Sequence, residues 1–257
     1  QTLTVSGTVT GAPVALRVVG NGTTVFDAAA TTDFSGILDI DGGTVLLNSA
    51  LTAATVDLAA AGTLVGPGTV SAAVTSTGGT VRAGSGNAPT APEALTADAT
   101  STVTLDSAST FEVRIASAAN FSQLVSQNGT TGVTLGGSTL NIVLDAGHGL
   151  DPTGTAAEQF VLVNGAAALS GAFGNVVEGG TISAGGFDFQ VTYAADGGND
   201  VVLTSLGEAP IELDVSLDGS GNLTVSDINA DSADTLTVTE DATDYIITSG
   251  GGRIQEG

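Results

Sequence analysis

The 257-residue sequence contains no cysteine, methionine or tryptophan, and aromatic residues make up only 4% of it. Without cysteine, the chain can form neither a disulfide framework nor a thiolate metal site. With so few aromatic side chains, the core has to be filled by valine, leucine, isoleucine and alanine, and the hydrophobic share of 42% is enough for a sizeable one. Small aliphatic cores of this kind suit repetitive β-structure.

Positive charge is almost as scarce. The chain has no lysine and 27 acidic residues, so its formal net charge is -23. Phosphate binding depends on Lys and Arg, so this balance disfavours nucleic acid and anionic membrane surfaces as partners. No apolar run approaches the roughly 18 residues of a membrane-spanning helix, so no membrane insertion by this chain is predicted. The four arginines are Arg17, Arg82, Arg114 and Arg253.

The residues that are abundant are those that form turns between many short strands. Glycine occurs 37 times, and segments of four to six residues with alternating apolar and polar side chains are separated by groups such as Asp41-Gly42-Gly43 and Gly66-Pro67-Gly68. In the first 81 residues these segments recur at the spacing of coils about 20 residues around, although no exact repeat is visible. The pattern predicts an all-β fold, an elongated parallel β-solenoid (β-helix).

Composition changes at two places along the chain. Residues 84 to 98 are rich in Gly, Pro and Ala and predict a loop projecting from the regular strands, which then resume. A polar joint at Gly207-Glu208-Ala209-Pro210 precedes a separate set of short strands. The predicted organisation is therefore a solenoid body over residues 1-206 and a small C-terminal β module over 207-257.

Several segments between residues 35 and 205 resemble the autotransporter-associated β-strand repeat region of bacterial surface proteins. They include Gly62-Thr63-Leu64-Val65-Gly66-Pro67-Gly68, Ser109-Thr110-Phe111-Glu112-Val113 and Gly197-Gly198-Asn199-Asp200-Val201. The resemblance implies a right-handed parallel β-helix displayed outside a bacterial cell, and the start at Gln1, without Met, favours a processed secreted form. The chain departs from the family where Gly84 to Pro92 replaces the usual Pro-Gly-Asn-Ser-Pro-Gly turn, and no translocating barrel domain follows.

The sequence offers little that resembles a catalytic site. His148 is the only histidine, and no nucleophile elbow accompanies it, so it is interpreted as a turn residue. Glu112 and Arg114, two apart on a predicted strand, face the same side and are interpreted as an exposed ion pair. We therefore expect no enzymatic activity.

Calcium is the one cofactor for which the sequence provides candidate ligands. Asp218, Ser220 and Asn222 begin like an acidic calcium loop, and Asp196 and Asp200 flank a Gly-Gly-Asn segment that faintly resembles β-roll calcium repeats. Both segments are equally the residues that tight turns require.

These observations favour a non-catalytic extracellular structural protein: a self-assembling fibre, surface-coat or adhesin component. The end strands of a solenoid leave backbone groups unpaired, so end-to-end self-association is expected, with Val5 and Val9 in the alternating segment at the N-terminus as the candidate edge. The alternative is a carbohydrate-binding or carbohydrate-cleaving β-helix with surface glycans as partners. Thr-x-Thr pairs such as Thr8 and Thr10 suit the solvent side of strands, and a flat ice-binding face is the alternative reading.

Overall fold

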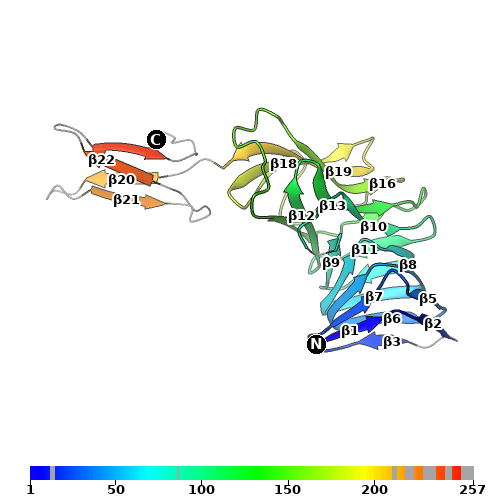
Figure 1. Ribbon diagram of the computed structural model, residues 1–257. Coiled ribbons are helices and arrows are strands. Elements are labelled where there is room, and N and C mark those ends of the chain that lie inside the picture. Colours follow the sequence, from blue (N-terminus) through cyan, green and yellow to red (C-terminus); the bar gives the residue numbers. More distant parts are fainter. Residues whose placement is uncertain are drawn as a thin grey trace.

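The computed structural model describes residues 1-11, 15-85 and 87-209, and the backbone of the strands at 213-217, 223-227, 236-240 and 245-249. Within these ranges every regular element is a β-strand and there is no helix, so the predicted all-β class is confirmed (Figure 1). None of the described residues forms a helix that is long and apolar enough to cross a membrane.

The strands of the main sheet fall into two groups by position. The first nine are β1 (Thr2–Val5), β2 (Thr8–Gly11), β3 (Leu16–Val18), β4 (Thr23–Phe26), β5 (Thr31–Phe34), β6 (Ile37–Leu47), β7 (Ala50–Gly66), β8 (Thr69–Ser76) and β9 (Thr80–Ala83). After the loop at 84-92 come β10 (Glu93–Ala97), β11 (Thr102–Leu105), β12 (Thr110–Ser117), β13 (Asn120–Ser126), β14 (Val133–Thr134), β15 (Thr139–Leu144), β16 (Gln159–Gly165), β17 (Thr181–Ala184), β18 (Phe187–Ala195) and β19 (Asp200–Glu208). The loop predicted over residues 84 to 98 therefore lies between β9 and β10, and the prediction is wrong for residues 93 to 97, which form β10.

Most pairings in this sheet are parallel and follow three series, which we call A, B and C. Series A runs β1, β4, the end of β6, the end of β7, β9, β12 and β15. Series B runs β2, β5, the start of β7, the start of β8, β10, β13 and β16. Series C runs β3, the start of β6, the middle of β7, the end of β8, β11 and β14. The long strands β6, β7 and β8 belong to more than one series, because the chain passes from one series to the next without leaving the ladder.

The separation between paired residues is not constant along the chain. In series A, Thr2 pairs with Thr23, 21 positions on, and Thr63 pairs with Thr80, 17 positions on. The next step, from Thr80 to Thr110, covers 30 positions. The spacing of about 20 residues predicted for the first 81 residues agrees with the steps found there, and the steps lengthen beyond them, where the loop after β9 and the hairpin between β12 and β13 add residues between strands.

One predicted turn lies inside a strand. Asp41-Gly42-Gly43 continues β6, and the ladder accommodates it by a register shift between Ile40 and Gly42. Gly43 has φ of 73°, and a Cβ on it would lie 2.4 Å from the carbonyl oxygen of Gly22. Glycine is required there because the backbone of β6 adopts a left-handed conformation directly against its neighbour.

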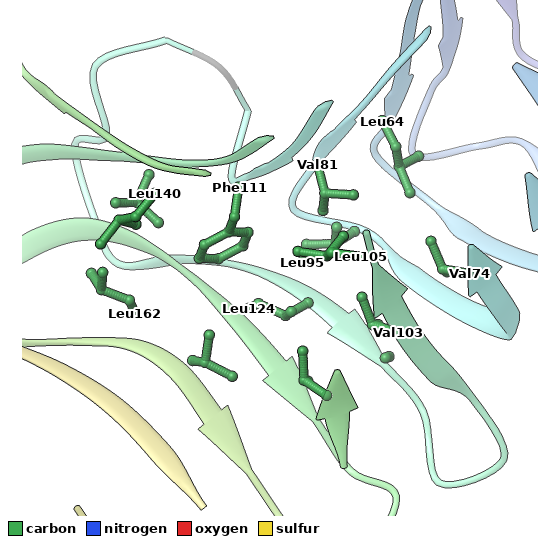
Figure 2. Close-up of a cluster of buried hydrophobic side chains, with 14 of the residues drawn as sticks. Leu64, Val74, Val81, Leu95, Val103, Leu105, Phe111, Leu124, Leu140 and Leu162 are labelled. Carbon is green, nitrogen blue, oxygen red and sulfur yellow. The ribbon is translucent and has the colours of Figure 1, made fainter. Parts of the chain in front are cut away.

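The core lies between the three series. Leu64, Val81, Phe111 and Leu140 occupy equivalent positions on successive strands of series A and are almost fully buried. Figure 2 shows them together with Leu95 and Leu124 of series B and Val74 and Val103 of series C, in one apolar cluster. Inward side chains that are nearly all aliphatic fill the space in layers that match the strand spacing.

In the last part of the main sheet the strands pair antiparallel instead of parallel. β16 pairs antiparallel with β19, β19 with β18, and β18 with β17. The core is richest in aromatic side chains here: Phe111 stacks on Phe173, and Phe160 contacts Phe121 and Phe189 edge to face. Larger side chains are needed because the strands of this part are joined by longer connections and enclose more space.

Two separate antiparallel hairpins follow the main sheet: β20 (Leu213–Leu217) with β21 (Leu223–Asp227), and β22 (Leu236–Glu240) with β23 (Tyr245–Ser249). The sequence pattern predicts strands at these four places. β19 extends to Glu208 and pairs there with Phe187, so the joint predicted from residue 207 onward begins inside the last strand of the main sheet.

Candidate functional site

The strands at the N-terminal end of the sheet have an open edge. β1, β2 and β3 pair only with β4, β5 and β6, and in the described part of the chain no strand lies on their other side (Figure 1). The amide of Thr23 donates to the carbonyl of Gln1 at 2.9 Å, and the amide of Asp27 donates to the carbonyl of Val5 at 3.1 Å. Backbone groups alternate sides along a strand, so those of Thr2 and Thr4 point away from β4 toward the open edge.

The apolar core is also incompletely covered at this end. Leu3 occupies the position that Val45 and Leu64 fill further along series A, yet its side chain is 62% exposed. Val5 of β1 and Val9 of β2, the residues predicted to form the self-association edge, are half-buried and pack against the core. Their side chains therefore belong to the first layer of the core, whereas the open hydrogen-bonding groups of β1 belong to Thr2 and Thr4.

Hydrogen-bond partners cover part of the opposite end of the sheet. In series A the side-chain amide of Asn175 accepts from the amide of Leu140 and donates to its carbonyl, both at 2.9 Å, as a neighbouring strand would. In series B the strand β19 covers β16. In series C Ser170 donates to the carbonyl of Val133 and accepts from the amide of Leu135, both at 2.9 Å. Each series thus has hydrogen-bond partners at this end, and series B continues through β19 and β18 to β17, which pairs on one side only among the described strands.

Arg17 on β3 is the one charged side chain on the first three strands. It contacts Asp41 and lies 3.5 Å from Asp39 on β6, and its side chain is 64% exposed. Burial, and then the neighbouring Asp41, raises the pKa of Asp39, whereas Arg17 lowers it. Arg17 thus offsets part of the repulsion between these two carboxylates.

The remaining described arginines sit in ion pairs between successive strands of series A. Arg82 on β9 lies 2.5 Å from the buried Glu112 on β12, which also accepts from Asn141 on β15 at 2.9 Å. Arg114 contacts Asp145, which follows β15. The predicted exposed pair between Glu112 and Arg114 is therefore wrong: each of the two pairs with a residue on another strand, because register brings those residues closer than their neighbour two along the chain. Such ion pairs join neighbouring strands and stabilise the register of series A.

A column of seven threonines runs along the outer face of series A. Its members face one another in successive strand pairs: Thr2, Thr23, Thr44, Thr63, Thr80, Thr110 and Thr139. Two positions further along the same strands the column contains Val25, Leu46, Arg82 and Glu112 instead. In series B, Thr10 faces Asp33. On the face of series A threonine thus forms one column, which suits the solvated side of strands, and not the flat two-dimensional array that an ice-binding face needs.

His148 lies in a turn, as the sequence predicts. Its amide donates to the carbonyl of Asp145 at 3.1 Å, its Nδ1 accepts from the amide of Leu150 at 3.2 Å, and its ring meets Phe187 edge to face. These two hydrogen bonds hold the turn itself, and neither involves a serine hydroxyl.

The two candidate calcium-binding segments lie in different parts of the chain. Asp196 is exposed, with φ of 46°, in the turn between β18 and β19, and Asp200 accepts from the amide of Gly165 at 3.0 Å. Among the described residues there is no group of three or more His, Asp or Glu side chains arranged for a metal ion. Asp218, Ser220 and Asn222 lie outside the described residues.

The aromatic side chains bear on the glycan alternative. Phe26, Phe111, Phe160, Phe173, Phe187 and Phe189 are buried, and Phe121 and Tyr193 are half-buried. The hydroxyl of Tyr193 donates to the carbonyl of Val176. None of the aromatic residues whose side chains are described is classed as exposed.

Comparison with known proteins adds no relative. No protein-family model matches this chain, and no curated protein sequence matches it.

Proposed function

We propose that this protein is a non-catalytic extracellular structural component, part of a surface coat, fibre or adhesin, built as a parallel β-solenoid that self-associates end to end. The observation that carries the proposal is the set of three parallel pairing series, in which each strand pairs with a strand 17 to 39 residues later, from Thr63 with Thr80 to Leu124 with Val163. The chain contributes strands to series A, then B, then C, and repeats this order. A chain that winds as a three-sided solenoid produces this pattern.

The arrangement of side chains supports a structural role. The described carboxylate clusters are occupied by arginines, backbone amides or hydroxyls, as for Glu112 with Arg82 and Asp200 with Gly165. Such contacts hold strands and turns in place. The acidic, lysine-free composition keeps a surface protein soluble at high local concentration, which fits the proposed secreted or cell-surface location on a bacterium.

The resemblance to the autotransporter-associated repeat region is part of the same proposal. Two of the segments that carry the resemblance contribute strands to series A, Thr63 to Gly66 on β7 and Thr110 to Val113 on β12, and Gly197 to Val201 leads into β19. A carbohydrate-binding β-helix is the weaker candidate, because the described aromatic side chains are turned into the core or half-covered.

Calcium enters the proposal as a stabilising ion of the turns rather than as a catalytic one. The candidate ligands are the carboxylate of Asp218, the hydroxyl of Ser220 and the side-chain amide oxygen of Asn222, and Ca²⁺ is bound by oxygen atoms. Comparing the melting temperature of the Asp218→Asn variant with that of the wild-type protein, each in calcium and in chelator, tests the idea. Equal calcium responses of the two proteins would remove this loop from the proposal.

The deciding experiment combines shape with ligand screening. Small-angle scattering and negative-stain electron microscopy of dilute protein are expected to show an elongated particle. Series A alone contains seven successive strands, and neighbouring strands are spaced about 4.8 Å apart. A glycan array and a polysaccharide-turnover assay are expected to show neither binding nor cleavage. Specific glycan binding or turnover would reject the structural role in favour of the alternative, and a compact particle would reject the solenoid.

A further inference from the structure

Aspartate followed by glycine is a sequence at which a side chain can react with its own backbone. The amide nitrogen of the glycine attacks Cγ of the aspartate, the amide hydrogen and the carboxyl hydroxyl leave as water, and a five-membered succinimide ring forms. A second water opens the ring at either carbonyl and yields aspartate or isoaspartate, in which the main chain runs through the side chain. Glycine favours the attack because it has no Cβ to hinder the backbone rotation that the ring requires.

The chain has three Asp-Gly pairs, and the structure describes two of them. They are Asp41-Gly42, Asp196-Gly197 and Asp218-Gly219, of which the last lies outside the described residues. Gly42 is buried within β6, where it pairs with Ala61 of β7, and a Cβ on it would lie 2.9 Å from the carbonyl oxygen of Gly20. The carboxylate of Asp41 contacts Arg17 on β3. Both reacting groups of this pair are therefore held by neighbouring strands.

The pair Asp196-Gly197 lies in the turn between β18 and β19. Both residues are exposed, and a Cβ on Gly197 would meet nothing within 4 Å. The carbonyl of Ala195 accepts from the amides of Gly198 at 2.9 Å and Asn199 at 3.2 Å, which closes the turn. Asp196, Gly197 and Gly198 all have positive φ, of 46°, 73° and 92°. The two reacting groups thus lie outside the strand ladder, where main chain and carboxylate can rotate without breaking a strand pairing.

We propose that Asp196 is a site of spontaneous isoaspartate formation, and that the strand ladder protects Asp41 from the same reaction. Gly42 can attack only after the ladder opens locally. We expect isoaspartate to form at Asp196 at least about tenfold faster than at Asp41, which corresponds to a local opening cost of about 1.4 kcal/mol. The product adds one methylene to the main chain of the turn, close to Asp200, which accepts from the amide of Gly165. This inference does not depend on the function proposed above.

Incubation of the folded full chain, followed by peptide mapping over time, tests the proposal. A protonated carboxyl group loses its oxygen as water, so the reaction at Asp196 is expected to be faster at about pH 5 than at about pH 8. Isoaspartate has the same mass as aspartate, and it is identified by chromatographic separation of the two peptides and by methylation with an isoaspartyl methyltransferase. Asparagine-glycine pairs such as Asn21-Gly22 are measured separately, because deamidation replaces an amide by a carboxylate and changes the mass.

The same chain in guanidinium chloride is the matched control, because unfolding removes the difference between the two environments. Circular dichroism verifies both states, and in the denatured chain we expect Asp41 and Asp196 to react at similar rates. Asp196→Asn preserves the turn, since asparagine tolerates positive φ, and is expected to form isoaspartate by loss of ammonia, faster at alkaline than at acidic pH. Equal rates at Asp41 and Asp196 in the folded protein, isoaspartate at Asp196 only after denaturation, or none in folded Asp196→Asn would each overturn the proposal.

Discussion

At the scale of single residues, the corners between series rely on short polar turns. Asp98 accepts from the amide and hydroxyl of Thr100 and from the hydroxyl of Ser101, and Asp106 repeats the arrangement with Ala108 and Ser109. The hydroxyl of Ser101 also donates to the carbonyl of Val70 on the neighbouring strand. Each corner thus bonds its own turn and the strand beside it, which satisfies backbone groups that leave the ladder.

Asp98 gives a prediction about pH. Burial raises the pKa of Asp98, but hydrogen bonds from Ser71, Thr100 and Ser101 outweigh it and lower the pKa from 3.8 to about 2. The folded-state pKa is depressed, so the associated stability is present above pH 3.8 and is lost as the pH falls toward 2. We expect Asp98→Asn to lower stability by about 1 kcal/mol at pH 7, with the difference from wild type shrinking as the pH falls.

Thermal unfolding followed by circular dichroism at pH 7 and at stepwise lower pH measures this difference. Asp33→Asn is the matched control, because Asp33 is exposed on β5, and its effect is expected to be small. If the stability difference between Asp98→Asn and the wild type stays constant down to pH 2, the substitution acts by changing the shape of the turn and not by removing the charge.

At the scale of elements, Asn175 takes the place of a missing strand. Its amide pairs with both backbone groups of Leu140 on β15, and the amide of Gly174 donates to the carbonyl of Ser138 at 2.8 Å. A side chain that occupies the edge in this way protects it from pairing with other chains.

Asn175→Ala is therefore expected to lower the free energy of unfolding by about 1 to 3 kcal/mol, because the N–H and C=O of Leu140 lose their partners. Urea unfolding measures the change, and Asn164→Ala on the exposed face of β16 is the control. Light scattering of the same sample should reveal species larger than the wild-type assembly, since the edge of β15 becomes available. Unchanged stability would mean that water replaces the asparagine without cost.

At the scale of the whole molecule, charge repulsion is the dominant electrostatic effect. The net charge is -23, and the described ion pairs involve only Arg17, Arg82 and Arg114. Repulsion among like charges destabilises the compact state, and salt screens it.

We expect the melting temperature to rise as sodium chloride is increased from about 10 mM to about 0.5 M, because screening shortens the range of this repulsion. Calcium chloride at matched ionic strength is the control, and any additional rise it produces marks a specific calcium site. A melting temperature that falls with salt would mean that the few ion pairs outweigh the repulsion.

The alternation of side chains indicates most strands but not their partners. Strands such as β12, β15 and β18 are evident from local pattern, because period-two alternation is a property of one segment. Five successive strands of series A begin with Gly or Ser followed by Thr, at Gly43-Thr44, Gly62-Thr63, Gly79-Thr80, Ser109-Thr110 and Ser138-Thr139. Aligning these pairs would have predicted the threonine column and the lengthening of the repeat, which the search for an even spacing of 20 residues misses.

By itself, the sequence determined that the protein is all-β, that its core is aliphatic and that its N-terminal 26 residues have no carboxylate, since these follow from composition and local periodicity. Only the tertiary structure decided which strands pair, that Glu112 contacts Arg82, and that Asn175 occupies part of the edge of β15. The physical reason is that pairing joins residues tens of positions apart, through loops whose lengths vary at little energetic cost. Register is set by all three series together, and a single segment does not contain that information.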